Sequence, residues 1–241
     1  MKKHSVCIAT YNGEKYIEDQ IKSIQMQLNE DDEIIISDDG SKDATLKICA
    51  KMREADPRIR IIKGPRKGFS CNFENAVKRA KGEIILFSDQ DDLWEPEKIV
   101  EIDRVFEENP DCTTILHTMS TFDEEHDDTN AIIVSYRPGI LKNYIKSSYW
   151  GCCMAVKREF IMRYIPFREY CAGHDQLTGL MSEKYGKTVF LNKKLLKHRL
   201  HSNNTSFTLP LKKKITFRIE MLKDFLYTDR VYKNKMKGKE V

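Results

Sequence analysis

Short apolar runs alternate with amphipathic stretches along the first half of the chain. The apolar runs predict buried strands over residues 5–10, 33–37, 60–63, 83–88 and 113–119. Between them, apolar residues recur at helical spacing in the ranges 17–28, 46–52, 69–80 and 99–106. This order of strands and helices predicts an α/β fold with a mostly parallel sheet and right-handed crossovers.

The second half has a weaker pattern. Residues 122–130 are acidic and predict a loop. The sequence then predicts a strand over residues 147–156, a helix over 175–185 and another strand over 188–191, which is followed by the polar segment 195–204. No repeat or low-complexity linker interrupts the chain. We therefore expect one domain over residues 1–210, divided at about residue 119, followed by a basic tail over residues 211–241.

The composition is that of a globular protein. Of 241 residues, 40% are hydrophobic and 32% are charged, and no apolar stretch approaches the length of a membrane span. The N-terminus has no signal-peptide core, so we expect a cytoplasmic protein. The seven cysteines are scattered and odd in number, which favours reduced thiols over a disulfide framework.

Charge is concentrated in the tail. Residues 211–241 contain ten basic and four acidic residues, whereas the other 210 residues contain 31 basic and 33 acidic ones. Four apolar residues on one helical face follow the lysines at 212–214: Ile215, Ile219, Leu222 and Leu226. We expect peripheral contact between this segment and the anionic inner face of the cell membrane. The alternative is that the apolar face packs on the domain or on a partner subunit.

The most informative segment is Asp89-Gln90-Asp91-Asp92, which follows the apolar run at 83–88. Open α/β sheets place ligands at the C-terminal ends of their strands. Carboxylates this close repel one another unless a cation lies between them, and a hard divalent ion such as Mn²⁺ or Mg²⁺ is the usual cation. The alternative is a solvated turn in which Asp92 caps the next helix and Pro96 falls in its first turn.

Two further loops leave the ends of predicted strands, Tyr11–Glu14 (YNGE) and Asp38–Ser41 (DDGS). In a doubly wound sheet these loops and the acidic segment converge on one crevice. An aromatic ring, carboxylates and a glycine there suit a nucleotide, although each loop alone is also explained by turn chemistry. Neither a Walker loop nor GxGxxG is present, so a metal ion would carry the diphosphate charge.

Taken together, these motifs resemble family-two inverting glycosyltransferases with the GT-A fold. The resemblance rests on CIATYNGEKYI (7–17), IIISDDGSKDAT (34–45), GFSCNFENAVKRAKGEIILFSDQDDLWEPEKI (68–99), GCCMAV (151–156), HDQ (174–176) and HRLHSNN (198–204). It covers about residues 4–206, and FSDQDDLW with GCCMA and HDQ is similar to bacterial rhamnosyltransferases of cell-surface polysaccharide synthesis. The resemblance implies a Rossmann-like, mixed and mostly parallel sheet flanked by helices. It also implies a nucleotide-sugar-binding half followed by an acceptor-binding half.

The resemblance implies a role for each matching position. The nucleotide sugar would contact Thr10, Tyr11, Asn12, Glu14, Asp39, Asp89 and Gln90. Asp91 would bind Mn²⁺ or Mg²⁺, together with His201, although His198 is a second candidate. Asp175 would be the general base, its alternative role being a helix N-cap; many members have Glu-Asp where this chain has His-Asp. The acceptor would contact Trp150, Gly151 and His174.

The implied reaction is metal-dependent transfer of a sugar, with inversion, from dTDP-rhamnose or a UDP-hexose to a glycan or lipid-linked acceptor. Such a displacement needs one base and no second catalytic carboxylate. One alternative is a sugar-phosphate nucleotidyltransferase. Such enzymes usually have a glycine-rich loop with a following lysine after the first strand, whereas the loop at 11–14 is neither glycine-rich nor basic. The other alternative is a non-catalytic carbohydrate- or cation-binding module. The presence of both Asp91 and a candidate base at Asp175 argues against it. We expect no nucleic-acid partner, and no pattern indicates the oligomeric state.

Overall fold

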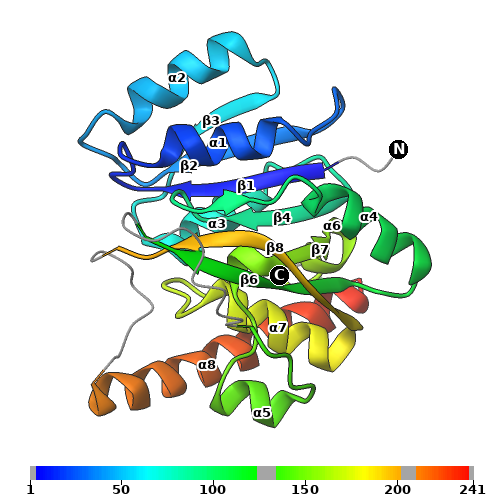
Figure 1. The fold of residues 1–241 in the computed structure, drawn as a ribbon. Coiled ribbons are helices and arrows are strands. Elements are labelled where there is room, and N and C mark those ends of the chain that lie inside the picture. Colours follow the sequence, from blue (N-terminus) through cyan, green and yellow to red (C-terminus); the bar gives the residue numbers. More distant parts are fainter. Residues whose placement is uncertain (1–3, 124–133, 202–209, 239–241) are drawn as a thin grey trace.

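The computed structural model describes residues 4–123, 134–201 and 210–238. An eight-stranded sheet runs through the middle of the molecule with helices around it (Figure 1). Its strands are β1 (His4–Thr10), β2 (Glu33–Asp38), β3 (Ile59–Lys63), β4 (Ile84–Ser88), β5 (Leu93–Trp94), β6 (Thr114–Phe122), β7 (Met154–Lys157) and β8 (Thr188–Arg199). The helices are α1 (Ile17–Gln25), α2 (Thr45–Ala55), α3 (Phe69–Val77), α4 (Lys98–Glu108), α5 (Ile140–Ile145), α6 (Arg158–Ile161), α7 (His174–Tyr185) and α8 (Leu211–Met236).

The first four long strands form a parallel half-sheet in the order β3-β2-β1-β4. Their apolar runs are buried, and Val6 of β1 lies beside Ile34 of β2 and Leu86 of β4. Burial of one such side chain contributes about 2 kcal/mol to folding. Because helices make each crossover, these strands all end at the same edge of the sheet, which confirms the predicted α/β pattern.

The second half extends the sheet with mixed pairing. β7 runs antiparallel between β4 and β6, β8 runs parallel to β6, and β5 runs antiparallel to β8. Two successive reversals make β6 and β8 parallel to β4. The end of β8 therefore lies at the same edge of the sheet as the end of β4.

Several boundaries differ from those predicted. The strand expected over 147–156 starts only at Met154, because residues 151–153 form a 3₁₀ turn. β8 continues beyond residue 191 into the polar segment and ends at Arg199, because Leu195 and Leu196 are buried there. Short elements β5, α5 and α6 carry too few residues for a periodic pattern and were not predicted. The loop expected at 122–130 lies mostly outside the described residues, although Phe122 still belongs to β6.

The C-terminal helix α8 packs on α5 and α7 through one face. Met221, Val231 and Tyr232 are buried on that face. The predicted apolar stripe points the other way: Ile215, Ile219, Leu222 and Leu226 are 44–58% exposed. The alternative that this stripe packs on the domain is therefore wrong. Within the described residues, no helix has the length and apolar character needed to cross a bilayer.

The first residue of β1 forms a buried ionic network. His4 Nδ1 lies 3.0 Å from Asp32, and Nε2 lies 2.9 Å from Asp103. Burial lowers the pKa of His4, but hydrogen bonds with Asp103 and Asp32 outweigh it and raise the pKa to about 9. The imidazolium therefore links β1 to the loop before β2 and to α4.

We expect His4→Gln to lower the free energy of unfolding by on the order of 2 kcal/mol at pH 6. A pKa raised on folding gives stability that is complete below the unfolded value of about 6.5 and is lost as the pH rises through about 9. The deficit of the variant relative to wild type, measured by urea unfolding at pH 6, 8 and 10, should therefore shrink with pH. A deficit that is the same at all three values would contradict this assignment.

Candidate active site

The acidic segment follows directly after the buried strand β4. Asp92 is buried, whereas Asp89 and Asp91 are partly exposed at the edge of the sheet. Asp92 is not a helix cap, because β5 intervenes and α4 starts at Lys98 after Glu97. The capping alternative for this segment is therefore wrong.

Two histidines from the end of β8 and the loop after it pair with two of these carboxylates. His198 Nδ1 lies 2.7 Å from Asp92 Oδ1, and His201 Nε2 lies 2.9 Å from Asp91 Oδ2. Burial lowers the pKa of His198, but the hydrogen bond with Asp92 outweighs it and raises the pKa to about 9. His198 is thus a cation bound to Asp92, and His201 is the histidine that reaches the D-x-D residue Asp91.

Crowding destabilises the ionised carboxylates. Burial raises the pKa of Asp89, and the charges of Asp92 and Asp91 raise it further. Burial and Asp92 likewise raise the pKa of Asp91, against the opposing hydrogen bond with His201. A divalent cation beside these groups would relieve the repulsion.

Arg199, the last residue of β8, hydrogen-bonds to the acidic segment and contacts two aromatic rings. Its backbone N–H donates to Asp92 Oδ1 at 3.2 Å, and its Nε donates to the carbonyl of Asp91 at 3.0 Å. The guanidinium lies 4.7 Å from the ring centroid of Tyr16 and 4.5 Å from that of Phe122. Sequence reasoning gave Arg199 no role, although its place between two candidate histidines was a usable signal.

Lys98 is a second residue that sequence reasoning missed. It is fully buried, its Nζ donates to the carbonyl of Cys152 at 2.8 Å, and the same atom lies 4.1 Å from the ring centroid of Trp94. Burial lowers its pKa to about 8, and the acidic groups Asp92 and Asp89 act in the opposite direction. Lys98 therefore adds a positive charge beneath the acidic segment. Trp94 lies in β5 and Lys98 opens α4, so no periodic pattern in the sequence indicated this contact.

The donor atoms present fit a divalent metal ion. Asp91 and His201 offer an oxygen and a nitrogen at the partly exposed side of the cluster. Deeper in the protein, Asp92, Cys152 and His198 carry potential ligand atoms within 4.8 Å of one another, but His198 would have to lose its imidazolium proton to act as a ligand. In the part of the chain described, Asp92 Oδ2 and His198 Nε2 are buried without a hydrogen-bond partner. Carboxylate oxygens suit Mn²⁺ or Mg²⁺, whereas the imidazole and the thiol are softer ligands.

The loop after β1 meets the other two loops, as predicted. Gln90 joins it to the acidic segment, since its Oε1 accepts from Tyr11 N at 3.0 Å and its Nε2 donates to Tyr11 O at 3.2 Å. Asn12 joins it to the loop after β2 through its own N–H to Ser41 Oγ and through Oδ1, which accepts from Lys42 N. The ring of Tyr11 is 54% exposed and is free to pack on a flat ligand.

The remaining predicted nucleotide contacts hold the loop backbone. Glu14 accepts from Ala44 N at 2.7 Å, and the hydroxyl of Thr10 donates to Asp38 at 3.1 Å. Both oxygens of Asp39 accept backbone N–H groups, from Arg66 at 2.6 Å and from Gly68 at 3.0 Å. A base would therefore meet an Asp39 carboxylate whose position is already fixed. These contact roles stay predictions.

The predicted acceptor residues and the predicted base lie together. Gly151 is needed beside His174, because a Cβ there would lie 2.9 Å from its Nε2. His174 is buried against Phe73, and burial lowers its pKa to about 4, so it is neutral. Asp175 is in the first turn of α7 and raises the pKa of Asp89. The cap of α7 is Gly173, so the N-cap alternative for Asp175 is wrong.

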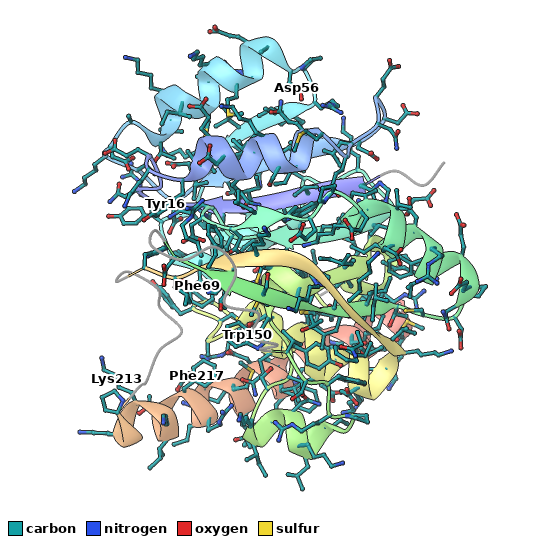
Figure 2. All side chains as sticks on the ribbon, in the orientation of Figure 1. Tyr16, Asp56, Phe69, Trp150, Lys213 and Phe217 are labelled. Carbon is teal, nitrogen blue, oxygen red and sulfur yellow. The ribbon has the colours of Figure 1, made fainter. Side chains whose placement is uncertain are left out.

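Figure 2 shows Tyr16 at the side of the molecule at which β1 ends, with Phe69 and Trp150 successively further in. The ring of Trp150 lies 6.3 Å from that of His198. The nucleotide loops, the acidic segment and the acceptor residues therefore share this side. Trp150 is only partly exposed, so its predicted contact with an acceptor stays a prediction.

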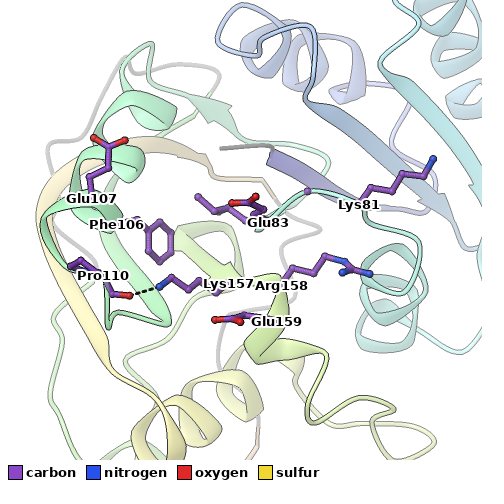
Figure 3. A pocket seen from close by; sticks show the side chains of 10 residues that line it. Lys81, Glu83, Phe106, Glu107, Pro110, Lys157, Arg158 and Glu159 are labelled. Atoms are coloured by element: carbon purple, nitrogen blue, oxygen red, sulfur yellow. Dashed lines mark hydrogen bonds between the residues drawn. The ribbon is translucent and has the colours of Figure 1, made fainter. Parts of the chain in front are cut away.

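A cavity of about 580 Å³ lies elsewhere (Figure 3). Ile84, the first residue of β4, lines it, so it opens at the opposite end of the strand from the acidic segment. Lys157 crosses it and donates to the carbonyl of Pro110 at 2.5 Å. This cavity is separate from the candidate active site.

Comparison with known proteins matches residues 5–165 to the family model described as Glycosyl transferase family 2. The chain is 29% identical over 226 residues to the dTDP-rhamnosyl transferase RfbG of Shigella flexneri, covering 82% of this chain and 72% of that protein. It is 34% identical over 122 residues to the uncharacterized glycosyltransferase alr2836 of Nostoc sp. (strain PCC 7120), covering 50% of this chain. The match spans 38% of the Nostoc protein's length.

Two solved structures resemble the whole fold. TarS 1–349 of S. aureus, in complex with UDP-GlcNAc, gives a TM-score of 0.69 at 19% identity and covers 96% of this chain and 70% of that one. The mannosyltransferase PcManGT of Pyrobaculum calidifontis, in complex with GDP-Man and Mn²⁺, gives a TM-score of 0.64 at 14% identity. This match covers 100% of this chain and 76% of that one. At these identities the likeness shows the fold, which is the expected GT-A fold.

We expect Gln90→Met to weaken binding of a nucleotide diphosphate. The substitution keeps the side-chain volume but removes both hydrogen bonds to the backbone of Tyr11, each of which contributes about 1 kcal/mol or less at this exposed position. Calorimetric titration with UDP or dTDP should show a loss of about three- to tenfold in affinity, with the melting temperature little changed. Unchanged affinity for both nucleotides would show that Gln90 does not position this loop.

Proposed function

Because the chain belongs to glycosyl transferase family 2, it is a sugar-transferring enzyme, and we propose that it is metal-dependent and inverts the anomeric configuration of the sugar. The donor would be a nucleotide-diphosphate sugar, and the product would belong to polysaccharide biosynthesis. Family membership sets aside both the nucleotidyltransferase and the non-catalytic binding module.

One observation carries the proposal, namely that the ends of β1, β2, β4 and β8 bring complementary groups to one edge. In this proposal Tyr11 and Asp39 would contact the nucleotide base, and Asp91 and His201 would hold the metal ion beside the diphosphate. Asp175 approaches from α7, close enough to influence Asp89 electrostatically. A nucleotide, a metal ion and a base are the three requirements of a single-displacement sugar transfer.

In the proposed mechanism Asp175 takes the proton of the acceptor hydroxyl as that oxygen attacks the anomeric carbon. One Asp175 oxygen accepts the Gln176 N–H at 2.7 Å, which orients the carboxylate. Asp91 and His201 would hold Mn²⁺ or Mg²⁺, which when bound neutralises charge developing on the leaving diphosphate. His174 is buried against Phe73 and burial lowers its pKa to about 4, so it would be a poor proton acceptor for an incoming hydroxyl, and Asp175 is the proposed base.

The proposed donor and acceptor are supported by what relatives and structural neighbours are named for or bind. The dTDP-rhamnosyl transferase RfbG supports dTDP-rhamnose, and the UDP-GlcNAc complex of TarS supports a UDP-hexose. A lipid-linked acceptor is supported by a Campylobacter jejuni relative, 38% identical over 94 residues, named GalNAc(5)-diNAcBac-PP-undecaprenol beta-1,3-glucosyltransferase. Transfer at the cytoplasmic face of the membrane would fit such an acceptor.

Replacement of the D-x-D residue tests the metal. Asp91→Asn removes a charged ligand at a partly exposed position, so turnover should fall by at least about a hundredfold while the fold remains intact. The rise in melting temperature caused by Mn²⁺ in wild type should also disappear. Asp111→Asn, which changes an exposed carboxylate away from the cluster, should behave as wild type. Full wild-type activity in EDTA would refute the metal dependence.

Replacement of the base tests the chemical step. Asp175→Asn keeps the side-chain shape but removes its basicity, so kcat should fall by roughly a hundredfold or more with the KM for the donor little changed. Glu159→Gln alters an acidic residue in the first turn of another helix, α6, and should leave kcat unchanged. If donor affinity collapses and kcat survives, Asp175 binds the donor. Retention of configuration in the wild-type product would exclude direct displacement.

A further inference from the structure

We propose that the outer faces of α5 and α8 form a docking surface for an anionic lipid bilayer. The docking surface is defined by the exposed aliphatic residues Leu141, Ile145, Ile215, Ile219, Leu222 and Leu226. The two helices lie side by side at the end of the molecule farthest from α2 (Figure 1), and Tyr144 Oη donates to the carbonyl of Arg218 at 2.9 Å. The structure thus adds α5 to the stripe that the tail sequence shows by itself.

Exposed apolar side chains are concentrated on these two helices. They carry nine of the fifteen exposed large hydrophobic residues found in the described ranges. Leu141 is 70% exposed and Leu226 is 58% exposed, although both belong to regular helices with a second face already packed. Exposed apolar side chains concentrated on two adjacent helices of a folded protein are typical of a contact with a partner or a membrane.

The acidic residues of α8 lie toward the body of the protein, whereas several of its basic residues are exposed. Its acidic residues are engaged with the body of the protein, since Asp224 and Glu220 bind Arg168 and Asp229 binds Lys184. The basic residues Lys212, Lys214 and Arg230 are exposed. α5 adds the exposed Lys142 and has no acidic residue, and the exposed Lys146 follows directly after it. The docking surface is therefore apolar with a basic border, which is the composition of helices that lie in a membrane interface.

This charge pattern favours a bilayer over a second copy of the chain as the partner of the docking surface. A second copy docked face to face would place basic borders against one another, which is unfavourable, whereas anionic lipid headgroups complement them. Aliphatic side chains inserted among acyl chains would add an apolar contribution that salt does not screen. A bilayer therefore accounts for the apolar centre and the basic border together.

The position of the docking surface relative to the active site is also informative. α8 begins near Lys213 and Phe217 on the side of the molecule that carries Tyr16 (Figure 2). Docking would therefore hold the active-site edge beside the membrane rather than facing away from it. If the proposed lipid-linked acceptor is correct, its head group would be presented to that edge, but binding to the bilayer does not require that acceptor.

Vesicle sedimentation tests the proposal with the full chain. Wild type should bind vesicles of phosphatidylcholine with 30% phosphatidylglycerol at least about tenfold more strongly than pure phosphatidylcholine, and 0.5 M NaCl should reduce that preference. The double variant Ile219→Gln/Leu222→Gln should lose at least about tenfold in binding. The double variant Lys212→Gln/Arg230→Gln should lose a similar factor on anionic vesicles only.

Matched controls come from α2 and α4, away from the docking surface. Leu46→Gln/Val100→Gln removes two exposed aliphatic residues and Lys47→Gln/Lys51→Gln removes two exposed charges, and both should bind vesicles as wild type does. Release of nucleoside diphosphate from a donor sugar in detergent-free buffer should be equal in all variants, which separates docking from catalysis. Equal binding by test and control variants would overturn the proposal. So would a wild-type dimer, without affinity for vesicles, that the Ile219/Leu222 variant converts to monomer.

Discussion

Repulsion among Asp89, Asp91 and Asp92 is the constraint on which the active site depends. A buried strand ends in three carboxylates, and burial together with mutual repulsion raises the pKa values of Asp89 and Asp91. The protein compensates with cations from two other elements, His198 from β8 and Lys98 from α4. The imidazole of His201 adds a polar partner for Asp91. The negative charge that these groups do not neutralise lies at the solvent side of the cluster, where a divalent ion and a diphosphate are expected.

The sheet topology makes this compensation possible. Because β7 is antiparallel to both β4 and β6, the strands β6 and β8 regain the direction of β4, and the end of β8 reaches the acidic segment. The same edge receives the nucleotide loops. Gln90 lies between two of the carboxylates in sequence and hydrogen-bonds to the backbone of Tyr11, so any movement of the acidic segment is transmitted to that loop.

The sequence predicts the parallel half-sheet well because each of its strands is a short apolar run followed by a turn. It predicts for the same reason that the loops after β1, β2 and β4 meet, since polar residues follow those strands directly. The pairing of Asp92 with His198 spans more than a hundred residues and depends on strand order, which periodicity does not encode. The burial of Lys98 opposes the usual preference of lysine for solvent, and β8 runs past residue 191 because tertiary packing overrides its polar sequence.

The central claim is that the metal ion and the nucleotide occupy one coupled site at the ends of β1, β2, β4 and β8. Calorimetric titration of UDP and dTDP, each with and without saturating Mn²⁺, measures that coupling directly. The account predicts that Mn²⁺ increases the affinity for at least one nucleotide by about tenfold or more, and that this nucleotide increases the affinity for Mn²⁺ by the same factor. Nucleotide affinity that does not depend on Mn²⁺ would contradict it.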